Sequence, residues 1–413
     1  MITQISRFEG TPEAFTLCLN PQASKTNIWT DTQNAILSDT GLAAARTTIS
    51  KWPRYAPTPL ITLPALAAEI GIAAVHFKDE GGRFGLGSFK ALGGAYAVAR
   101  LLQAKVSEKL GRDVSMAEIT ALDHGKIVSG TTVCCATDGN HGRSVAWGAR
   151  TFGCNCVIFI HATVSEGRKS AIEDYGAEVR RCKGNYDDSV REAQVTATRD
   201  GWFVVSDTSY PGYMEVPKDV MQGYELMAAE AISALDAPPT HIFLQTGVGG
   251  MAAAVVAHVV RKFGAERPMI VLCDPDKSAC VLESVRVGTP TAVEGDLDTL
   301  MAGLACGEVS ALAWEILRDH GDAVMAVTDD CAVQAMRRLA CPPAGDTPIV
   351  AGESAVAGLE GLSVAMKDPQ AREMLGLDAH SSVLLFGTEG DTDAALYAEL
   401  VGATGDEIRG GHR

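Results

Sequence analysis

Residues 83–94 read RFGLGSFKALGG and place a single lysine, Lys90, among apolar side chains and glycines. A lysine does covalent chemistry when an apolar setting keeps its amine neutral, or when a carbonyl cofactor holds it as a Schiff base. The glycines allow a ligand or another stretch of backbone to come close, because they carry no side chain. Lys90 is therefore a candidate catalytic residue, and an ordinary surface lysine at the start of a helix is the alternative.

The sequence on both sides of this stretch alternates between short apolar runs and longer runs with helical periodicity. Continuous apolar runs are typical of strands that are covered on both faces. The expected strands are residues 74–80, 131–137, 156–162, 177–182, 202–207, 241–247, 268–274 and 382–388, and helices are expected at 63–71 and 88–105. This alternation predicts an α/β fold with parallel sheets.

Three stretches depart from the alternation. Residues 1–38 show little periodicity and are expected to form an irregular arm, after which Asp39 or Thr40 can cap a helix. Residues 105–130 are polar and are expected to form a surface insertion. Residues 340–348 contain three prolines and a glycine, which predicts a loop.

The length and composition of the chain limit its possible functions. A chain of 413 residues exceeds the usual size of one hydrophobic core, so two domains are expected. The formal net charge of −16 argues against a nucleic-acid partner, because phosphate binding needs a basic surface. The 11 cysteines show no zinc-binding spacing, which favours buried thiols in a reducing compartment. Neither a signal-peptide layout nor a long apolar run is found, so we expect a cytoplasmic protein without a membrane segment.

The strand expected at 131–137 is followed by a turn with the sequence DGNHG. In open α/β sheets ligands bind at the carboxyl ends of strands, where backbone N–H groups and a helix N-terminus can hold a carboxylate. A carboxylate next to such an anion site has a raised pKa or meets a cationic group of the ligand, which makes Asp138 unusual there. A simple helix cap in an Asp-Gly turn is the alternative.

A second turn, QTGVGGMAAA at 245–254, lies between an expected strand and a helix of small residues. Its glycines can present successive N–H groups to a phosphate, and the helix dipole adds to the binding. The pattern G-x-G-x-x-A through Ala252, with Asp274 at the end of the next strand, also resembles a dinucleotide-binding fingerprint. A nicotinamide-dependent oxidoreductase that uses the 247–252 turn is therefore an alternative, but it gives Lys90 no role.

A third turn, FGTEGDTD at 386–393, ends another expected strand. Its Thr388 carries a neutral hydroxyl, which can hydrogen-bond a ring nitrogen. Turns of this composition are common, so this one supports a binding site only together with the other two.

These stretches, in this order, resemble the fold-type II pyridoxal-phosphate enzymes, the group of tryptophan synthase β and threonine dehydratase. From about residue 40 onward the chain is similar to the diaminopropionate ammonia-lyase family. The stretches that carry this resemblance are KDEGGRFGLGSFKALGGAYA, TDGNHGRSVAW, NYDDSVR, DTSYPGY, MQGY, PDKSAC, LMAGLACGE and GTEGDTD. The resemblance implies two open, mostly parallel sheets flanked by helices, with pyridoxal 5'-phosphate bound between two domains.

The resemblance also implies roles for individual residues. Lys90 would form the Schiff base with the cofactor, Asn140 would bond its phenolic oxygen, and Thr388 would face its pyridine nitrogen and leave it unprotonated. The cofactor phosphate would lie on Gly247, Val248, Gly249 and Gly250. Lys90 would remove the α-proton of an L substrate, Asp138 that of a D substrate, and Asp207 would hold the β-ammonium group. The substrate is expected to contact Thr137, Asp138, Gly139, His141 and Asp207.

The function implied by the resemblance is β-elimination of ammonia from 2,3-diaminopropionate, which gives pyruvate and a second ammonia. The nearest alternative is a dehydratase or β-lyase of a 3-hydroxy or 3-substituted amino acid with the same cofactor, and a catalytically silent amino-acid-binding regulator is another. The large domain is expected to combine residues 1–94 and 231–413, and the small domain to span 95–230. We expect a homodimer that binds a small amino-acid substrate and neither nucleic acid nor membrane.

Overall fold

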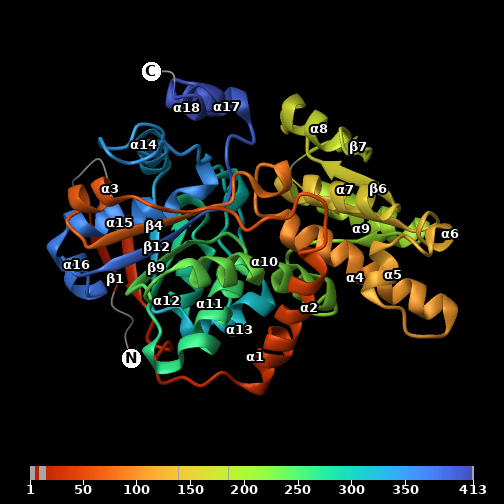
Figure 1. Cartoon of the computed structure of the whole chain (residues 1–413), viewed down its shortest axis with the longest axis horizontal. Coiled ribbons are helices and arrows are strands. Elements are labelled where there is room, and N and C mark those ends of the chain that lie inside the picture. Colours follow the sequence, from red (N-terminus) through yellow and green to blue (C-terminus); the bar gives the residue numbers. More distant parts are fainter. Residues whose placement is uncertain (1–4, 9–14, 138, 185, 412–413) are drawn as a thin grey trace. The chain divides into compact units, whose positions relative to one another are not determined.

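The computed structural model describes residues 5–8, 15–137, 139–184 and 186–411. The chain forms two compact units, called unit 1 and unit 2 below. Unit 1 combines residues 1–36, 57–82 and 227–413, and unit 2 combines residues 37–56 and 83–226. Figure 1 shows the elements of both units, coloured along the chain. Among the described residues, no helix combines the length and the apolar composition that a membrane span requires.

Within the described residues, unit 1 contains an eight-stranded sheet with the order β1-β2-β11-β10-β9-β12-β4-β3. The strands are β1 (Ile5–Phe8), β2 (Phe15–Leu19), β3 (Leu60–Thr62), β4 (Ala74–Asp79), β9 (His241–Gln245), β10 (Met269–Pro275), β11 (Ala323–Val327) and β12 (Ser382–Gly387). The strands from β11 to β4 in this order pair in parallel, and antiparallel pairs join β1 to β2, β2 to β11 and β3 to β4. The prediction of a mostly parallel sheet is confirmed.

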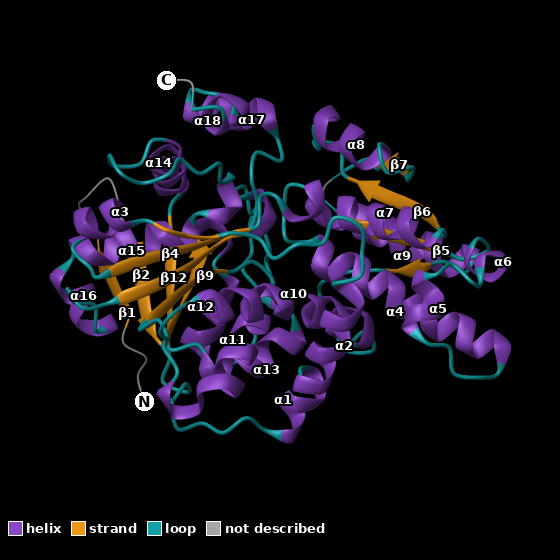
Figure 2. Ribbon diagram, in the orientation of Figure 1, coloured by secondary structure: helices purple, strands orange, loops and turns teal. Residues whose placement is uncertain are grey.

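The central strands of unit 1 are buried on both faces. In β9, Phe243 and its neighbours Ile242 and Leu244 all have no exposed surface, so side chains pointing to either face are covered. The described helices of unit 1 are α1 (Asp31–Ile36), α3 (Pro64–Ile70), α11 (Gly250–Phe263), α12 (Cys280–Val287), α13 (Ala311–His320), α14 (Asp329–Ala340), α15 (Ala357–Lys367), α16 (Pro369–Leu375), α17 (Ala394–Val401) and α18 (Gly405–Arg409). Figure 2 shows the strands in orange among these helices.

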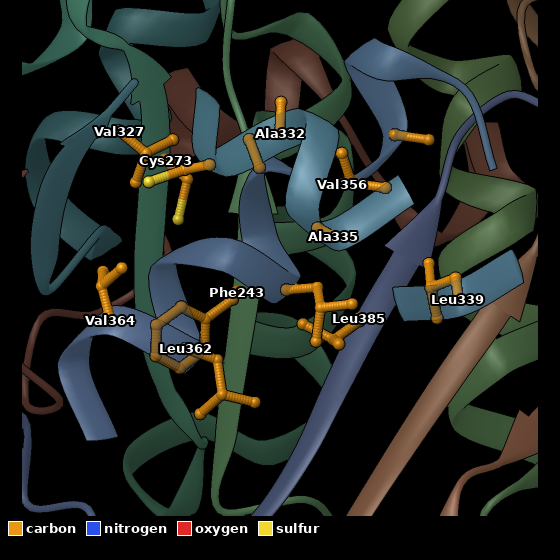
Figure 3. Packing of buried hydrophobic residues seen from close by; sticks show 14 of the residues in the cluster. Phe243, Cys273, Val327, Ala332, Ala335, Leu339, Val356, Leu362, Val364 and Leu385 are labelled. Carbon is orange, nitrogen blue, oxygen red and sulfur yellow. The ribbon is translucent and has the colours of Figure 1, made fainter. Parts of the chain in front are cut away.

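Helix α15 packs directly on the sheet and closes the main core. It contacts β9, β10, β11 and β12. In Figure 3, Leu362 of α15 lies beside Phe243 of β9, and Leu385 of β12 belongs to the same cluster. The approach is close because α15 carries Gly358 at the contact: a Cβ there would lie 2.9 Å from the carbonyl oxygen of Phe243.

We expect Gly358→Ala to destabilise the protein. The added methyl would meet the backbone of β9, which cannot rotate aside as a side chain can. Overpacking of this kind costs about 1–3 kcal/mol, which exceeds the gain in helix propensity of about 1 kcal/mol. Urea unfolding followed by circular dichroism measures the difference. Gly125→Ala is the matched control, because a Cβ at Gly125 meets no other atom within 4 Å, and equal midpoints for the two variants would contradict the prediction.

Unit 2 contains a four-stranded parallel sheet within the described residues, with the order β7-β6-β5-β8. The strands are β5 (Thr132–Ala136), β6 (Asn155–Ile160), β7 (Glu178–Arg181) and β8 (Phe203–Val204). The described helices are α2 (Asp39–Ile49), α4 (Ala91–Leu110), α5 (Met116–Thr120), α6 (Gly125–Val128), α7 (Asn140–Phe152), α8 (Glu166–Glu173) and α9 (Tyr186–Asp200). Helix α10 (Glu215–Ala234) contributes residues to both units. The second parallel sheet confirms the predicted fold class.

The expectation of an irregular arm at residues 1–38 was wrong. Strands β1 and β2 and helix α1 lie in this range, and β2 pairs antiparallel with β11. The strand β11 was not predicted, although its residues Ala323–Val327 are all buried. The cap of α2 is Ser38, whose side chain accepts from the N–H of Gly41, and not Asp39 or Thr40. Short segments such as these acquire their structure from the strand or helix beside them, which a local pattern does not reveal.

The units differ from the predicted domain ranges at residues 37–56 and 83–94, which lie in unit 2, and at residues 227–230, which lie in unit 1. Residues 37–56 belong to unit 2 because their helix α2 packs on α4. Residues 83–94 belong to it because Lys90, within this range, immediately precedes α4. The stretch 105–130 contains the last residues of α4 and the helices α5 and α6. It is anchored by buried apolar side chains, namely Val106, Val114, Ile119 and Val128.

Candidate active site

Lys90 lies at the N-cap position of α4 and forms an ion pair with Asp207. Its Nζ is 2.5 Å from Oδ2 of Asp207, and both side chains are 19% exposed. The rings of Phe89 and Tyr224 lie near the ammonium group, with centroids 5.5 and 5.8 Å from Nζ. Burial alone would raise the pKa of Asp207, but Lys90 and then His141 outweigh it and hold that pKa well below its usual range. Asp207 is therefore ionised because a cation stands beside it.

Tyr213 fixes the chain around Asp207. Its hydroxyl donates to the carbonyl oxygen of Val204 and accepts from the N–H of Ser206, both at 2.9 Å. Its ring also stacks on that of Tyr210, with 5.2 Å between centroids. These contacts hold the segment DTSYPGY against the end of β8, and the sequence had suggested no role for either tyrosine.

The turn after β5 is closed by Thr137. Its hydroxyl accepts hydrogen bonds from the N–H groups of Gly139 and Gly142, both at 3.1 Å. These two N–H groups therefore serve the turn itself, and Asn140 begins α7 directly afterwards. Asp138, the predicted second base, lies outside the described residues.

His141 lies beside Asp207 in the same unit. Its Nε2 donates to the carbonyl oxygen of Val205 at 2.7 Å, since a carbonyl can only accept, and its Nδ1 is 3.7 Å from Oδ2 of Asp207. Burial lowers the pKa of His141, with Lys90 adding to that effect and Asp207 opposing it. His141 is therefore neutral at physiological pH and does not replace Lys90 as the partner cation of Asp207.

In unit 1, the glycine turn joins β9 to α11. Gly249 is the N-cap of α11 and has φ of +87°, a backbone conformation that glycine adopts without strain. No side chain caps α11, so its first N–H groups are not occupied by a capping group. The N–H of Ser310 donates to the carbonyl oxygen of Val248 at 2.9 Å and fixes the turn.

Thr388 directly follows β12, also in unit 1, and is 4% exposed. Its hydroxyl accepts from Nε2 of Gln245 at 2.8 Å and donates to the carbonyl oxygen of Ser354 at 3.4 Å. Gln245 is the last residue of β9, two residues before Gly247. The glycine turn and the threonine hydroxyl thus lie at the carboxyl ends of neighbouring parallel strands, where open α/β sheets bind ligands.

A family model described as "Pyridoxal-phosphate dependent enzyme" matches residues 51–386. This chain belongs to that family. It is 40% identical over 364 residues to a diaminopropionate ammonia-lyase of Salmonella typhimurium, covering 85% of this chain and 89% of the relative. A diaminopropionate ammonia-lyase of Escherichia coli is also 40% identical, over 374 residues that cover 89% and 92% of the two chains. The predicted family and the predicted cofactor are confirmed.

A solved structure supports the same assignment. The chain resembles the Escherichia coli diaminopropionate ammonia-lyase in complex with an aminoacrylate-PLP azomethine reaction intermediate, with a TM-score of 0.84 and 36% identity. The match covers 96% of this chain and 98% of that chain. The predicted fold-type II architecture is therefore confirmed across nearly the full length.

The residues of this pyridoxal-phosphate enzyme fit the cofactor chemically. The uncapped N-terminus of α11 offers N–H groups and a helix dipole to a phosphate, which compensates for the strongly acidic composition of the chain. Lys90 carries a primary amine, a group that is able to bond a carbonyl cofactor. Thr388 supplies a neutral hydroxyl, which suits an aromatic ring nitrogen. Unit 1 thus contains groups that suit a phosphate and a ring nitrogen, and unit 2 contains an amine that suits a carbonyl.

The carboxylate of Asp274 has a structural role and is therefore not available to bind the hydroxyls of a ribose. It is the last residue but one of β10 and has no exposed surface, accepts from the hydroxyl of Thr246, and accepts at 2.9 Å from the N–H of Leu282. A dinucleotide-binding enzyme needs this carboxylate at the surface of its site, where it can reach the ribose hydroxyls. The acidic residue in the fingerprint therefore joins β10 to α12 and does not support the nicotinamide alternative.

We expect Asp274 to make the stability of the protein depend on pH. Burial raises the pKa of Asp274 from 3.8 to about 7, although the Thr246 hydroxyl and backbone N–H groups oppose it. A raised folded-state pKa contributes stability that is complete below pH 3.8 and is lost as the pH rises through about 7. Asp274→Asn should therefore gain stability relative to the wild type by up to about 1.4 kcal/mol per pH unit as the pH rises from 3.8 to about 7, and the difference should stay constant at higher pH. Urea midpoints of both proteins at a series of pH values measure this, and parallel curves would contradict it.

Proposed function

We propose that this enzyme eliminates ammonia from 2,3-diaminopropionate. With one water molecule, the reaction yields pyruvate and two molecules of ammonia. The observation that carries the proposal is the ion pair between Lys90 and Asp207, because it combines a candidate base with a partly buried carboxylate whose charge a cation stabilises. The Salmonella and Escherichia coli relatives are named for the same reaction.

Asp207 is the proposed determinant of the leaving group. Once the amine of Lys90 is bonded to the cofactor carbonyl, Asp207 loses its free ammonium partner. The β-ammonium group of diaminopropionate can replace that partner, whereas the hydroxyl of serine carries no charge. Asp207 would therefore bind the charged substrate and keep its β-nitrogen protonated, ready to leave as neutral ammonia.

Lys90 is the proposed base for the L isomer. After the amino group of the substrate has displaced it from the cofactor carbonyl, the free amine of Lys90 would take the α-proton. The electron pair of the C–H bond would form a double bond between the α- and β-carbons, and the β-nitrogen would leave with the electron pair of its own bond. Pyridoxal phosphate, when bound, supplies an electron sink that makes the α-proton acidic. Water then hydrolyses the remaining enamine to pyruvate and ammonia. Asp138 is proposed to take the α-proton of the D isomer.

The other predicted residues are proposed to position the cofactor and the substrate. Gly247, Val248, Gly249 and Gly250 would hold the phosphate, Asn140 the phenolic oxygen and Thr388 the ring nitrogen. Thr137, Gly139 and His141 would line the substrate site. Since the N–H of Gly139 is bonded to Thr137, its proposed contribution is to leave space rather than to donate.

A panel of substrates tests the proposed function. Purified enzyme with pyridoxal phosphate is given the D and L isomers of diaminopropionate, serine and threonine, and the release of pyruvate or 2-oxobutyrate is measured. We expect the highest kcat/KM with diaminopropionate. A higher kcat/KM with serine or threonine would contradict the proposal and favour a dehydratase.

The oligomeric state and compartment are also proposals. We propose a cytoplasmic homodimer, and the 11 cysteines, all of them free thiols, fit a reducing compartment. Light scattering of the holoenzyme, with and without reductant, measures the mass. A monomeric mass would contradict the proposed dimer.

A further inference from the structure

We infer that Gln245 is a positioning residue that makes the hydroxyl of Thr388 a hydrogen-bond donor and thereby keeps the ring nitrogen of the cofactor unprotonated. The inference rests on the proposed role of Thr388 at that nitrogen. It does not depend on which amino acid is the substrate. Both residues lie in unit 1, where all contacts that carry the inference are found.

The orientation of the Gln245 amide is fixed by a carbonyl. Gln245 is 2% exposed, and its Nε2 lies 2.7 Å from the carbonyl oxygen of Phe386. A carbonyl oxygen accepts and never donates, so the amide atom at this position is the nitrogen and not the oxygen. The opposite orientation would place two acceptors 2.7 Å apart in a buried site, which is strongly unfavourable.

The same nitrogen determines how Thr388 hydrogen-bonds. Nε2 of Gln245 is 2.8 Å from Oγ1 of Thr388, and an amide N–H only donates, so the hydroxyl accepts there. The hydroxyl hydrogen must then point elsewhere. The carbonyl oxygen of Ser354 is the recorded acceptor at 3.4 Å, well beyond the usual O–H···O distance of about 2.7–2.8 Å, so it competes weakly.

A hydroxyl that accepts one hydrogen bond is a stronger donor through its own hydrogen and a weaker acceptor through its second lone pair. Thr388 therefore favours a ring nitrogen with a free lone pair over a protonated ring nitrogen. Gln245 also brings the positive end of its amide dipole to this place, which disfavours a second positive charge nearby. The chain thus uses a buried neutral amide to set the protonation state of the cofactor.

Ring-nitrogen NMR of the holoenzyme without substrate tests the inference. Wild-type protein and variants are reconstituted with pyridoxal phosphate carrying ¹⁵N in the ring, and the ring ¹⁵N shift is recorded. We expect the wild-type signal at the unprotonated position. We expect Gln245→Met, and the closely isosteric Gln245→Glu, to move it toward the protonated position, because neither supplies two N–H donors.

The control is Gln33→Met. Gln33 is a second buried glutamine of unit 1, which donates to the carbonyl oxygen of Glu315 at 2.8 Å and has no recorded contact with Thr388. This variant should leave the ring signal unchanged. Thr388→Val should move the signal by itself, and adding Gln245→Met to it should produce no further change.

The outcomes distinguish the inferred role of Gln245 from the proposed role of Thr388. If Thr388→Val moves the signal but neither Gln245 variant does, the role of Gln245 is wrong while Thr388 keeps its place. If no variant moves the signal, the proposed contact of Thr388 with the ring nitrogen is wrong, and the inference falls with it. The proposed diaminopropionate activity is independent of both results, because no substrate is present in the measurement.

Discussion

We expect the Lys90→Ala substitution to abolish both the release of pyruvate and the covalent attachment of the cofactor. The variant lacks both the amine that bonds the cofactor carbonyl and the base that takes the α-proton. Loss of a positioned base alone lowers a rate by about 10²–10⁴-fold, so the loss of both functions should exceed this range. Pyruvate release is measured together with absorbance of the lysine-bound cofactor before and after borohydride treatment.

Two further variants separate the possible causes of that loss. Lys90→Arg keeps a cation near Asp207 but cannot bond the cofactor carbonyl, so it should fold normally and remain inactive. Lys105→Ala, on the same helix α4, removes an exposed ion pair with Glu108 and should leave activity unchanged. A Lys90→Ala protein that still binds the cofactor covalently would place the attachment on another lysine.

Asp207→Asn is expected to impair diaminopropionate turnover far more than serine turnover. The amide cannot supply the charge that binds a β-ammonium group, and a charge-assisted hydrogen bond contributes about 1.5–3 kcal/mol. The kcat/KM for diaminopropionate should therefore fall by about 10- to 150-fold, since about 1.4 kcal/mol corresponds to a factor of ten. The kcat/KM for serine, whose hydroxyl is neutral, should change by less than about threefold, the scale of a weak surface contact. Steady-state kinetics with both substrates measure the ratio.

The control for this substitution is Asp219→Asn. Asp219 also pairs with a cation of unit 2, Arg100, at 3.3 Å, but its partner is exposed and lies outside the candidate site. Both kcat/KM values should stay near those of the wild type. Equal losses on diaminopropionate and serine in Asp207→Asn would show that Asp207 supports the site in general and does not select the leaving group.

Much of the fold follows from the sequence because parallel strands are buried on both faces. Residues 242–244 and 383–386 are continuous apolar runs within the expected strands 241–247 and 382–388, which form β9 and β12 within two residues of those bounds. Strand β2 was missed because it is short and lies in a polar segment, and its pairing with β11 bridges about 300 residues of chain. No local pattern contains such a pairing.

In the candidate site, too, some residues could be predicted from the sequence and others could not. Lys90 and the glycines at 247–250 stand out in the sequence, since only a few residue types can bond a carbonyl or allow a backbone to approach a phosphate. Tyr213 and Gln245 do not stand out, because tyrosine and glutamine are ordinary in strands and loops. Their roles come from hydrogen bonds to residues such as Val204 and Thr388, and these partners become known only when the chain is folded.

The sequence by itself determined the α/β class, the family and the lysine at its centre, because each depends on residue type and local spacing. Only the tertiary structure decided that Asp207 is ionised beside Lys90, that Asp274 is a buried structural carboxyl, and that Gln245 donates to Thr388. The physical reason is that charge and hydrogen-bond direction depend on burial and on neighbours distant in the chain. Lys90 and Asp207 are separated by 117 positions, and their 2.5 Å contact exists only in the fold.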